Sequence, residues 1–333
     1  MNEKKHKVCT TVGIIANPES GKDIRRLVSH ASVFDNMEKV NIVERILTTL
    51  QTFGIRKILV MPDTFGIVMR AINAIGKDLE IDIDFLPIEV LGNWKDTYKA
   101  TRQMKDKVSA IMVIGGDGTN RIVAKACGDV PIMPLSTGTN NVFPYMMEAT
   151  IAAEAVAAIV MGFTTKEEGT YKRKRLEIFQ EDKLKDIALI DIAVTMHSYV
   201  GAKAIWKPEL LKEIVVTECS PYNIGLSSIA GNIKEIKMAE DHGFYLEIGD
   251  GEMIKAAIAP GVLKEIGIKN FRILNLDEKV KLKNISSLLA LDGERELDIN
   301  SDVYVKITRD GPIVINYQKT LRIAAQRGFF KIR

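Results

Sequence analysis

A glycine-rich turn between an apolar run and a helix-compatible run constrains the fold of this chain most strongly. The apolar run at 110–114 ends abruptly in the turn GGDGT at 115–119, and a helix-compatible run follows at 121–127. A second short apolar run, 131–135, ends in STGTNN at 136–141. Strand–turn–helix units of this kind build parallel sheets. Both turns are therefore predicted at the carboxyl edge of neighbouring strands, which is where open α/β sheets bind ligands.

The rest of the first half alternates strand and helix patterns. Apolar runs predict strands at 12–16, 55–61 and 81–90, and helical spacing of apolar residues predicts helices at 36–53, 66–77, 94–107 and 148–162. Asp35 stands three residues before Glu38, in the manner of a capping box for the helix at 36–53. The β-α-β-α order predicts a Rossmann-like α/β domain over residues 1–163, with helices on both faces of a parallel sheet.

The pattern changes after a polar stretch at 164–170, where we place the domain boundary. Short alternating runs separated by Gly, Asp and Asn predict strands at 176–179, 187–196, 213–217, 244–248, 254–259, 271–276, 280–282 and 303–307. This spacing predicts an all-β, sandwich-like second domain over residues 164–316. The segment 317–330 is amphipathic enough for a closing helix.

Composition excludes several classes of protein. The chain has 333 residues, of which 46% are hydrophobic and 27% charged, and its net charge of +3 is too small to indicate a nucleic-acid partner. No apolar run approaches the ~18 residues of a membrane span. Three cysteines without C-x-x-C spacing suggest a reduced, cytoplasmic protein, and four histidines show no zinc-ligand spacing. These residues are Cys9, Cys127 and Cys219, and His6, His30, His197 and His242.

The chemistry of the first turn centres on Asp117. Glycines and a helix start are enough to cradle a phosphate, and a cradle needs no carboxylate. A phosphoryl-transfer site needs one, as a proton acceptor or as a magnesium anchor. Three glycines around one acid also exceed what a connecting turn requires. Asp117 is therefore the candidate catalytic residue, and Thr119 is expected to serve partly as the N-cap of the next helix.

Two further segments admit more than one interpretation. Residues 17–23, NPESGKD, superficially suggest a phosphate-binding P-loop, but Ala16 replaces the first glycine and Asp23 replaces the magnesium-binding Ser or Thr. This segment is either a tight turn or, through Asn17, Ser20 and Gly21, part of a nucleotide pocket. The basic run KRKR at 172–175 is typical of a solvated face, and an electrostatic role toward phosphates in the interdomain cleft is the alternative.

Taken together, these residues resemble the ATP-NAD kinase superfamily, which also includes diacylglycerol and sphingosine kinases. Within it, the chain looks most like the acetoin-catabolism X type. The motifs that carry the resemblance stand in the same order along nearly the whole chain, at 17–21, 115–119, 136–141, more loosely 220–231, and 291–294. The GGDGT motif is specific to the superfamily and not to one substrate.

The resemblance implies transfer of the γ-phosphoryl group of ATP to an alcohol, with Mg²⁺, and a C-terminal segment, 317–333, that returns to the first domain. The acid matching Asp117 activates the alcohol, and related kinases form homo-oligomers. The implied nucleotide- and phosphate-binding residues are Asn17, Ser20, Gly21, Gly115, Gly116, Gly118, Thr119, Ser136, Gly138, Thr139, Asn140 and Asn141. The implied substrate-binding residues are Asp191, Ser227, Ser228, Asp292 and Glu294.

One departure bears on the acceptor. NAD kinases usually carry Asn-Glu where this chain has Ile190-Asp191, and Ile190 offers no side-chain hydrogen bond. The NAD 2′-hydroxyl is the expected acceptor, with ATP or polyphosphate as the donor. A lipid alcohol of the diacylglycerol or sphingoid type is the alternative, because the motifs at 17–21 and 292–294 look closer to the lipid-kinase branch. A nucleotide-sensing homologue without turnover is the third hypothesis.

Overall fold

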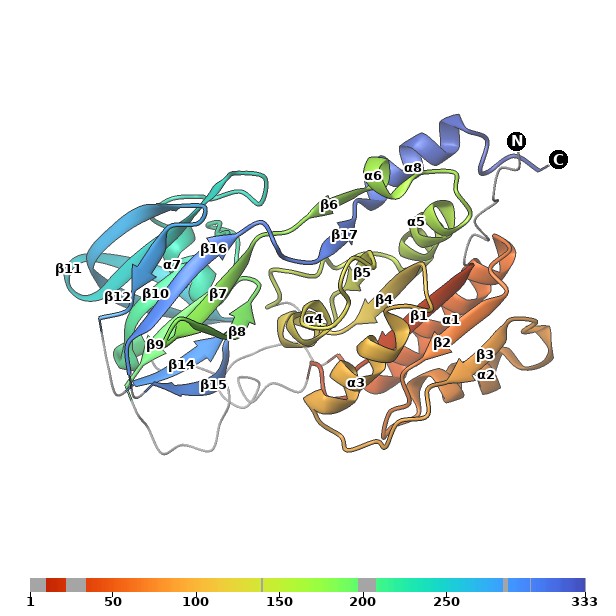
Figure 1. Ribbon diagram of the computed structural model, residues 1–333, viewed down its shortest axis with the longest axis horizontal. Helices are drawn as coiled ribbons and strands as arrows, with labels where there is room; N and C mark the ends of the chain where they lie inside the picture. The colour runs from red at the N-terminus through yellow and green to blue at the C-terminus, as the bar shows by residue number, and fades with distance from the viewer. Residues whose placement is uncertain are drawn as a thin grey trace.

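The structure is a computed structural model that describes residues 10–21, 34–138, 140–196, 208–283, 287–299 and 301–332. Two domains lie side by side along the long axis of the molecule (Figure 1). Several residues singled out from the sequence fall outside the described part, namely Cys9, His6, His30, Thr139, His197 and the side chain of Glu294.

The first domain is built on a seven-stranded sheet. Its order is β3 (Asp82–Phe85), β2 (Lys57–Val60), β1 (Thr11–Ala16), β4 (Ala110–Ile114), β5 (Ile132–Leu135), β17 (Ile313–Ile315) and β6 (Thr170–Lys172). All neighbours pair in parallel except β17 and β6. The predicted parallel sheet is confirmed, although the strand expected at 81–90 is limited to β3. Because the chain leaves β1 toward β2 and later returns to β4 on the other side, the switch point of the sheet lies between β1 and β4.

Helices cover both faces of this sheet, as predicted. One apolar core joins it to α1 (Asn36–Thr52), α2 (Ile67–Ile75), α5 (Ala149–Val160) and α8 (Tyr317–Gln326), and a second core joins it to α3 (Trp94–Met104) and α4 (Asp117–Ala124). Short helical turns lie at η2 (Gly76–Asp78) and α6 (Lys166–Gly169). Asp35 caps α1 by accepting a 2.9 Å hydrogen bond from the Glu38 N–H. Helix α4 begins at Asp117, four residues before the predicted start.

The second domain is a sandwich of two antiparallel sheets, as expected. One sheet is ordered β13 (Lys279–Lys281), β16 (Val303–Thr308), β7 (Arg175–Gln180), β8 (Lys183–Ala188). The other is ordered β12 (Val262–Asn275), β11 (His242–Ala259), β10 (Leu211–Val216), β9 (Asp191–Thr195), β14 (Ser287–Leu291), β15 (Glu294–Ile299). Apolar side chains from both sheets form the core between them, and α7 (Leu226–Gly231) packs on the outer face of the larger sheet with a short 3-10 turn, η3 (Pro208–Leu210), before β10.

The strand predictions in this domain differ from the structure in several details. The run 187–196 is divided between β8 and β9 by a bend at Leu189-Ile190, and 244–259 forms one long strand, β11, with bulges. The hairpin β14–β15 was not predicted as strands. Its turn residues Asp292 and Gly293 have φ of 50° and 79°, which is the left-handed pair that a two-residue hairpin turn requires.

The chain crosses between the domains twice, and the two crossings run together (Figure 1). The Arg173 N–H donates to the Pro312 carbonyl at 3.0 Å, and the Gly311 N–H donates to the Arg173 carbonyl at 3.0 Å. After β17, helix α8 packs against α5, and the Thr164 hydroxyl donates to the Thr320 carbonyl at 2.9 Å. The end of the chain therefore returns to the first domain, as the resemblance implies. Strands β6 and β17 belong to the first sheet although they lie beyond residue 163.

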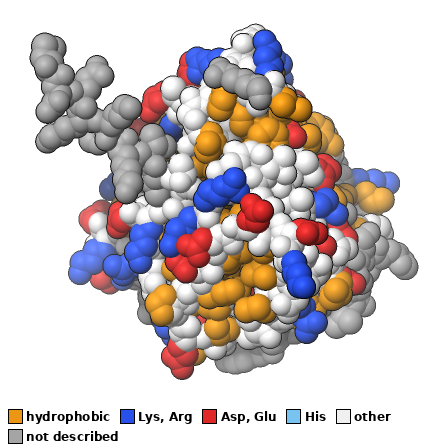
Figure 2. Space-filling view, turned by 90° about the vertical axis from the view of Figure 1, so that its right-hand side faces the viewer, with side chains coloured by type: hydrophobic (Ala, Val, Ile, Leu, Met, Phe, Trp, Pro, Cys, Tyr) orange, Lys and Arg blue, Asp and Glu red, His pale blue; other side chains and the backbone are white. Residues whose placement is uncertain are grey.

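The outer face of the first domain carries exposed apolar side chains in two areas, separated by a band of charged residues (Figure 2). Exposed large hydrophobic residues of this domain are Met37, Met69, Val90, Leu91, Trp94, Tyr145, Met146, Ile151, Met161, Phe330 and Ile332. The homo-oligomer implied by the resemblance stays a prediction. Within the described residues, none of the helices has the length and apolar character needed to cross a membrane.

Candidate functional site

Three loops meet at the carboxyl edge of the first sheet, at its switch point. Asn17 follows β1, Gly115 follows β4 and Ser136 follows β5. The Asn17 side-chain amide donates to the Thr119 hydroxyl at 2.9 Å, which bridges the crevice between β1 and β4. The Thr137 hydroxyl donates to the Ser20 hydroxyl at 3.0 Å. The structure thus brings together the loops that were expected to meet from the order of the strands alone.

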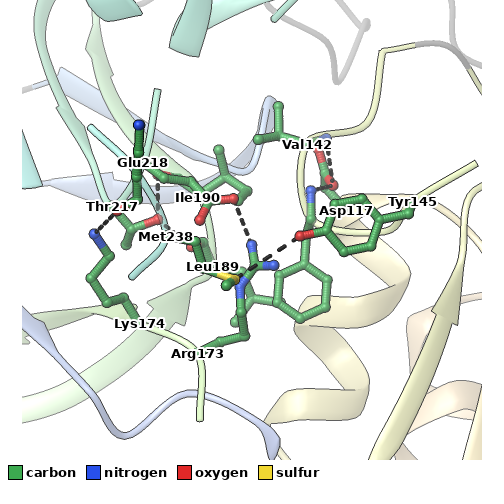
Figure 3. A network of polar contacts seen from close by, with 12 residues as sticks. Asp117, Val142, Tyr145, Arg173, Lys174, Leu189, Ile190, Thr217, Glu218 and Met238 are labelled. Atoms are coloured by element: carbon green, nitrogen blue, oxygen red, sulfur yellow. Dashed lines mark hydrogen bonds and ion pairs between the residues drawn. The ribbon is translucent and has the colours of Figure 1, made fainter. Parts of the chain in front are cut away.

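Asp117 is the first residue of α4, and its carboxylate is held by the loop after β5 (Figure 3). Oδ1 accepts from the Phe143 N–H at 2.9 Å, and both carboxylate oxygens lie within 3.2 Å of the Val142 nitrogen. The Asp117 N–H in turn donates to Asn141 Oδ1 at 3.3 Å. A carboxylate at a helix N-terminus is also favoured by the helix dipole. The acid is therefore fixed in orientation at the edge where ligands bind.

The first two glycines of the motif are required by close packing. A Cβ on Gly115 would lie 2.7 Å from the Thr119 side chain, and a Cβ on Gly116 would lie 2.8 Å from Asn141 Oδ1. The Gly115 N–H donates to the Leu135 carbonyl at 3.1 Å, so this amide is part of the hydrogen bonding of the sheet. We had expected it to bind phosphate. Helix geometry leaves the N–H groups of the first turn of α4, those of Gly118 and Thr119, without intrahelical partners.

The loop after β5 is a tight turn stabilised by hydrogen bonds within the loop. The Asn141 side-chain amide donates to the Ser136 hydroxyl at 2.8 Å and to the Gly138 carbonyl at 3.3 Å. The Ser136 hydroxyl donates to the same carbonyl at 2.7 Å. Asn140 lies in this turn next to Thr139, which is outside the described residues. Since Asn141 also accepts from Asp117, this turn fixes the start of α4.

Thr119 does not cap α4. The N-cap position is Gly116, because the helix starts at Asp117 and not at residue 121. Thr119 lies in the first turn of the helix, and its hydroxyl accepts the hydrogen bond from Asn17. The loop after β1 is the tight turn that one interpretation expected: the Ser20 hydroxyl donates to the Asn17 carbonyl at 2.8 Å, and Gly21 has a φ of 75°.

Lys39 is a further residue of this site that was not predicted from the sequence. This lysine on α1 is fully buried, and its Nζ donates to the carbonyls of Asn17, Pro18 and Ser20 at 2.9, 3.3 and 2.7 Å. It also donates to Asn36 Oδ1 at 3.0 Å. Lys39 thus holds the loop after β1 in place through its backbone. A signal existed, since residue 39 falls on the apolar stripe of the helix one turn before Val43.

Asp292 anchors the bend between β8 and β9. Its buried carboxylate accepts from the N–H groups of Leu189, Ile190 and Asp191 at 3.0, 2.7 and 3.2 Å. Arg121 Nε on α4 lies 3.6 Å from Asp292 Oδ2. Burial raises the pKa of the Asp292 carboxyl above its usual value, and the Arg121 guanidinium and the three amides oppose that shift. The expected substrate-binding role of Asp292 remains a proposal, and its described contacts are with the protein.

Helix α4 is joined to the second domain by two basic residues. Arg121 Nη1 lies 3.5 Å from Asp186 Oδ2, and Lys125 Nζ pairs with Asp186 Oδ1. Neither Arg121 nor Lys125 was selected from the sequence. Their spacing of four residues places them on one face of the helix that follows the GGDGT turn. The helix that carries Asp117 is therefore tied to β8 and to the β14–β15 turn.

The other described residues expected at the acceptor side are buried, at different places in the protein. Asp191 Oδ1 accepts from the Gly293 N–H at 3.2 Å, and Ile190 is buried in the apolar core beneath α3 and α4. Ser228 donates to the Gly225 carbonyl at 2.7 Å, and the buried Ser227 hydroxyl has no hydrogen-bond partner among the described residues. Both serines lie on α7, apart from α4 (Figure 1).

The basic run at 172–175 is only partly a solvated face, because Lys172 is exposed and the two residues after it are buried. Arg173 and Lys174 are 1% and 2% exposed because they lie where the chain passes between the domains. Arg173 Nη2 donates to Glu218 Oε1 at 2.6 Å (Figure 3). Lys174 Nζ donates to the carbonyls of Lys237 and His242 at 3.2 and 2.7 Å. Burial lowers the pKa of Lys174 to about 8.

Comparison with known proteins identifies the family. Residues 12–163 match the ATP-NAD kinase N-terminal domain, and residues 174–310 match the acetoin catabolism protein X C-terminal domain. Acetoin catabolism protein X of Cupriavidus necator is 37% identical over 316 residues, covering 91% of this chain and 88% of that protein. The chain belongs to the acetoin catabolism protein X family. The resemblance stated from the motifs is confirmed.

The solved structures similar to this acetoin catabolism protein X family member include an NAD kinase and a diacylglycerol kinase. An NAD kinase from Archaeoglobus fulgidus in complex with ATP is 17% identical, with a TM-score of 0.44 over 80% of this chain and 96% of that chain. A diacylglycerol kinase from Bacillus anthracis str. Sterne is 14% identical, with a TM-score of 0.43 over 93% of this chain and 98% of that chain.

The residues at the switch point fit a weakly held magnesium ion better than a dedicated metal cage. Among the described residues, no group of three or more His, Cys, Asp or Glu side chains is placed to hold a metal. Mg²⁺ in kinase sites is commonly held by one or two carboxylates together with substrate phosphates. At this edge of the sheet, Asp117 is a carboxylate that directly follows the strand–turn unit of β4.

Proposed function

We propose that this protein transfers the γ-phosphoryl group of ATP to a hydroxyl of a small metabolite, with the 2′-hydroxyl of NAD, giving NADP, as the first acceptor to test. The observation that carries the proposal is the fixed carboxylate of Asp117 at the start of α4, at the switch point of a parallel sheet. The match of residues 12–163 to the ATP-NAD kinase N-terminal domain supports ATP as the donor.

In the proposed reaction, the backbone N–H groups at the start of α4 bind phosphate, and the Asp117 side chain accepts a proton. The N–H groups of Gly118 and Thr119, with the dipole of the helix, hold phosphate oxygens. The acceptor hydroxyl gives its proton to the Asp117 carboxylate as its oxygen forms a bond to the γ-phosphorus, and ADP leaves with the electrons of the broken P–O bond. The Val142 and Phe143 amides keep the carboxylate aimed during this step.

A magnesium ion would be held by the nucleotide phosphates and by Asp117. When bound, it neutralises the charge that develops on the phosphate oxygens. Asn17 and Thr119 would keep the loop after β1 and the helix start at a fixed separation around the nucleotide, because their side chains are joined at 2.9 Å.

A second candidate acceptor is a lipid alcohol of the diacylglycerol or sphingoid type. Ile190 and Asp191, which match the NAD-gripping pair of NAD kinases, are engaged inside the protein, with Ile190 in an apolar core and Asp191 on the Gly293 N–H. Because both residues make contacts within the protein, this pair supports the lipid alcohol as the second candidate to test. The motif at 17–21 and the sequence Asp292-Gly293-Glu294 point to the lipid branch.

A transfer assay with labelled γ-phosphate tests the proposal. Purified protein is incubated with Mg²⁺ and labelled ATP, with NAD, NADH, soluble diols and diacylglycerol in mixed micelles as separate acceptors, and with polyphosphate as an alternative donor. Label on NAD supports the first acceptor, and label only on the lipid supports the second. Tight nucleotide binding without transfer to any acceptor would contradict the proposal and favour a nucleotide-sensing protein.

A further inference from the structure

Arg173 occupies an unusual place for a charged residue. It lies in the crossing between β6 and β7, it is buried, and its guanidinium faces two partners from different domains. On the side of the second domain, Nη2 donates to Glu218 Oε1 at 2.6 Å. On the side of the first domain, the guanidinium lies over the ring of Phe143, 4.4 Å from its centroid. A flat cation on an aromatic face, away from water, is a stabilising and geometrically specific contact.

Phe143 connects this contact to Asp117. Its ring is fully buried beneath the Arg173 guanidinium, and its backbone N–H donates to Asp117 Oδ1 at 2.9 Å. Figure 3 shows Asp117, Val142, Tyr145 and Arg173 gathered at this point. Because ring and amide belong to one residue, a ring that loses its partner lets the amide move relative to the carboxylate.

We propose that Arg173 is a positioning residue for Asp117, acting through Phe143. Arg173 is held by its ion pair with Glu218 of the second domain, and its guanidinium packs on the Phe143 ring. This packing fixes the position of Phe143 and thereby keeps the Val142 and Phe143 amides hydrogen-bonded to the Asp117 carboxylate. The acid that receives the acceptor proton is thus aligned by the domain expected to bind the acceptor. The catalytic consequence rests on the proposed function, whereas the structural link does not.

Hydrogen exchange at residues 142 and 143 tests the structural link without any substrate. Asp117→Ala calibrates the readout, because removing the carboxylate should speed exchange of both amides. Arg173→Gln is expected to speed their exchange about 10-fold, and Arg173→Lys, which keeps the charge but loses the flat face, should have a smaller effect in the same direction. Lys172→Gln is the matched control, since Lys172 is an exposed neighbour paired with Asp310.

Exchange at 142 and 143 equal to wild type in both Arg173 variants would overturn the proposal. If Arg173→Gln does not fold, Arg173→Lys decides by the same criterion. A second arm measures phosphoryl transfer, where the Arg173 variants should lower kcat about 10- to 30-fold, the size expected for a desolvated cation–π contact, and leave the KM for ATP unchanged. If the wild type transfers no phosphate, the proposed function fails while the exchange arm still decides the role of Arg173.

Discussion

The guanidinium of Arg121 lies 3.6 Å from the carboxylate of Asp292, and both side chains are buried. Arg121 stands on the helix that begins with Asp117, and Asp292 stands in the β14–β15 turn of the other domain. The same carboxylate holds the bend that carries Ile190 and Asp191. One ion pair therefore joins the start of the expected phosphoryl site to the expected acceptor side.

Replacing Arg121 should destabilise the whole protein. Arg121→Met leaves Asp292 buried without its cation, which typically costs about 3–5 kcal/mol of unfolding free energy. Urea unfolding followed by circular dichroism measures this loss. Arg45→Met is the matched control, because Arg45 pairs with Glu38 and Glu148 at partly exposed positions, and such pairs contribute about 0–1 kcal/mol each. Equal losses in the two variants would contradict a buried interdomain pair.

Replacing Lys39 should loosen the loop after β1. Lys39→Met removes a buried donor from three carbonyls, and each unsatisfied group costs about 1–3 kcal/mol. We expect lower stability, faster amide exchange over residues 17–20 and weaker ATP binding, measured by hydrogen exchange and calorimetry. Lys57→Met, at an exposed lysine on β2, is the control. Wild-type exchange over 17–20 in the folded Lys39 variant would show that the loop does not depend on it.

The bridge between Asn17 and Thr119 should appear as a coupling energy. In a double-mutant cycle of Asn17→Ala and Thr119→Val, the two losses in ATP affinity or stability should be non-additive by about 0.5–1.5 kcal/mol, because each single change already breaks the 2.9 Å hydrogen bond. Strict additivity of the two substitutions would mean that the bridge does not form in solution.

The buried Lys174 predicts a specific dependence of stability on pH. Burial lowers its pKa from 10.5 to about 8, so between these values the unfolded chain binds more protons than the folded one. The contribution of this group to unfolding free energy therefore rises as the pH rises from about 8 to 10.5. The unfolding free energy of the wild type minus that of Lys174→Met should increase over this range. Lys172→Met is the control for removing an exposed lysine. A difference that stays flat or falls would contradict the burial of a charged Lys174.

The meeting of these loops at one edge of the sheet was predictable, because its signals are local. Three glycines around Asp117, and a second small-residue turn after the next strand, identify two loops at one edge of a parallel sheet. The hydrogen bonds between the two loops were not predictable. The Val142 and Phe143 amides reach Asp117 across 25 and 26 residues, and no pattern in the sequence indicates that contact.

The buried cations were missed for a similar reason. Lys39, Arg121 and Arg173 each look like surface residues by type, and burial of a charge depends on partners far away in the chain, such as Asp292 for Arg121. The β14–β15 hairpin was not predicted, although the Asp292-Gly293 turn is a known hairpin signal. The strand break at Ile190 depends on that same distant turn.

The most direct test of the account is phosphoryl transfer by Asp117→Asn. The asparagine keeps an oxygen for the Val142 and Phe143 amides but cannot accept the acceptor's proton. We predict normal folding, normal affinity for ATP measured without Mg²⁺, and a rate of transfer about 100- to 10,000-fold below wild type. A folded Asp117→Asn protein that binds ATP and transfers phosphate within about threefold of the wild-type rate would contradict a role for Asp117 as the proton acceptor.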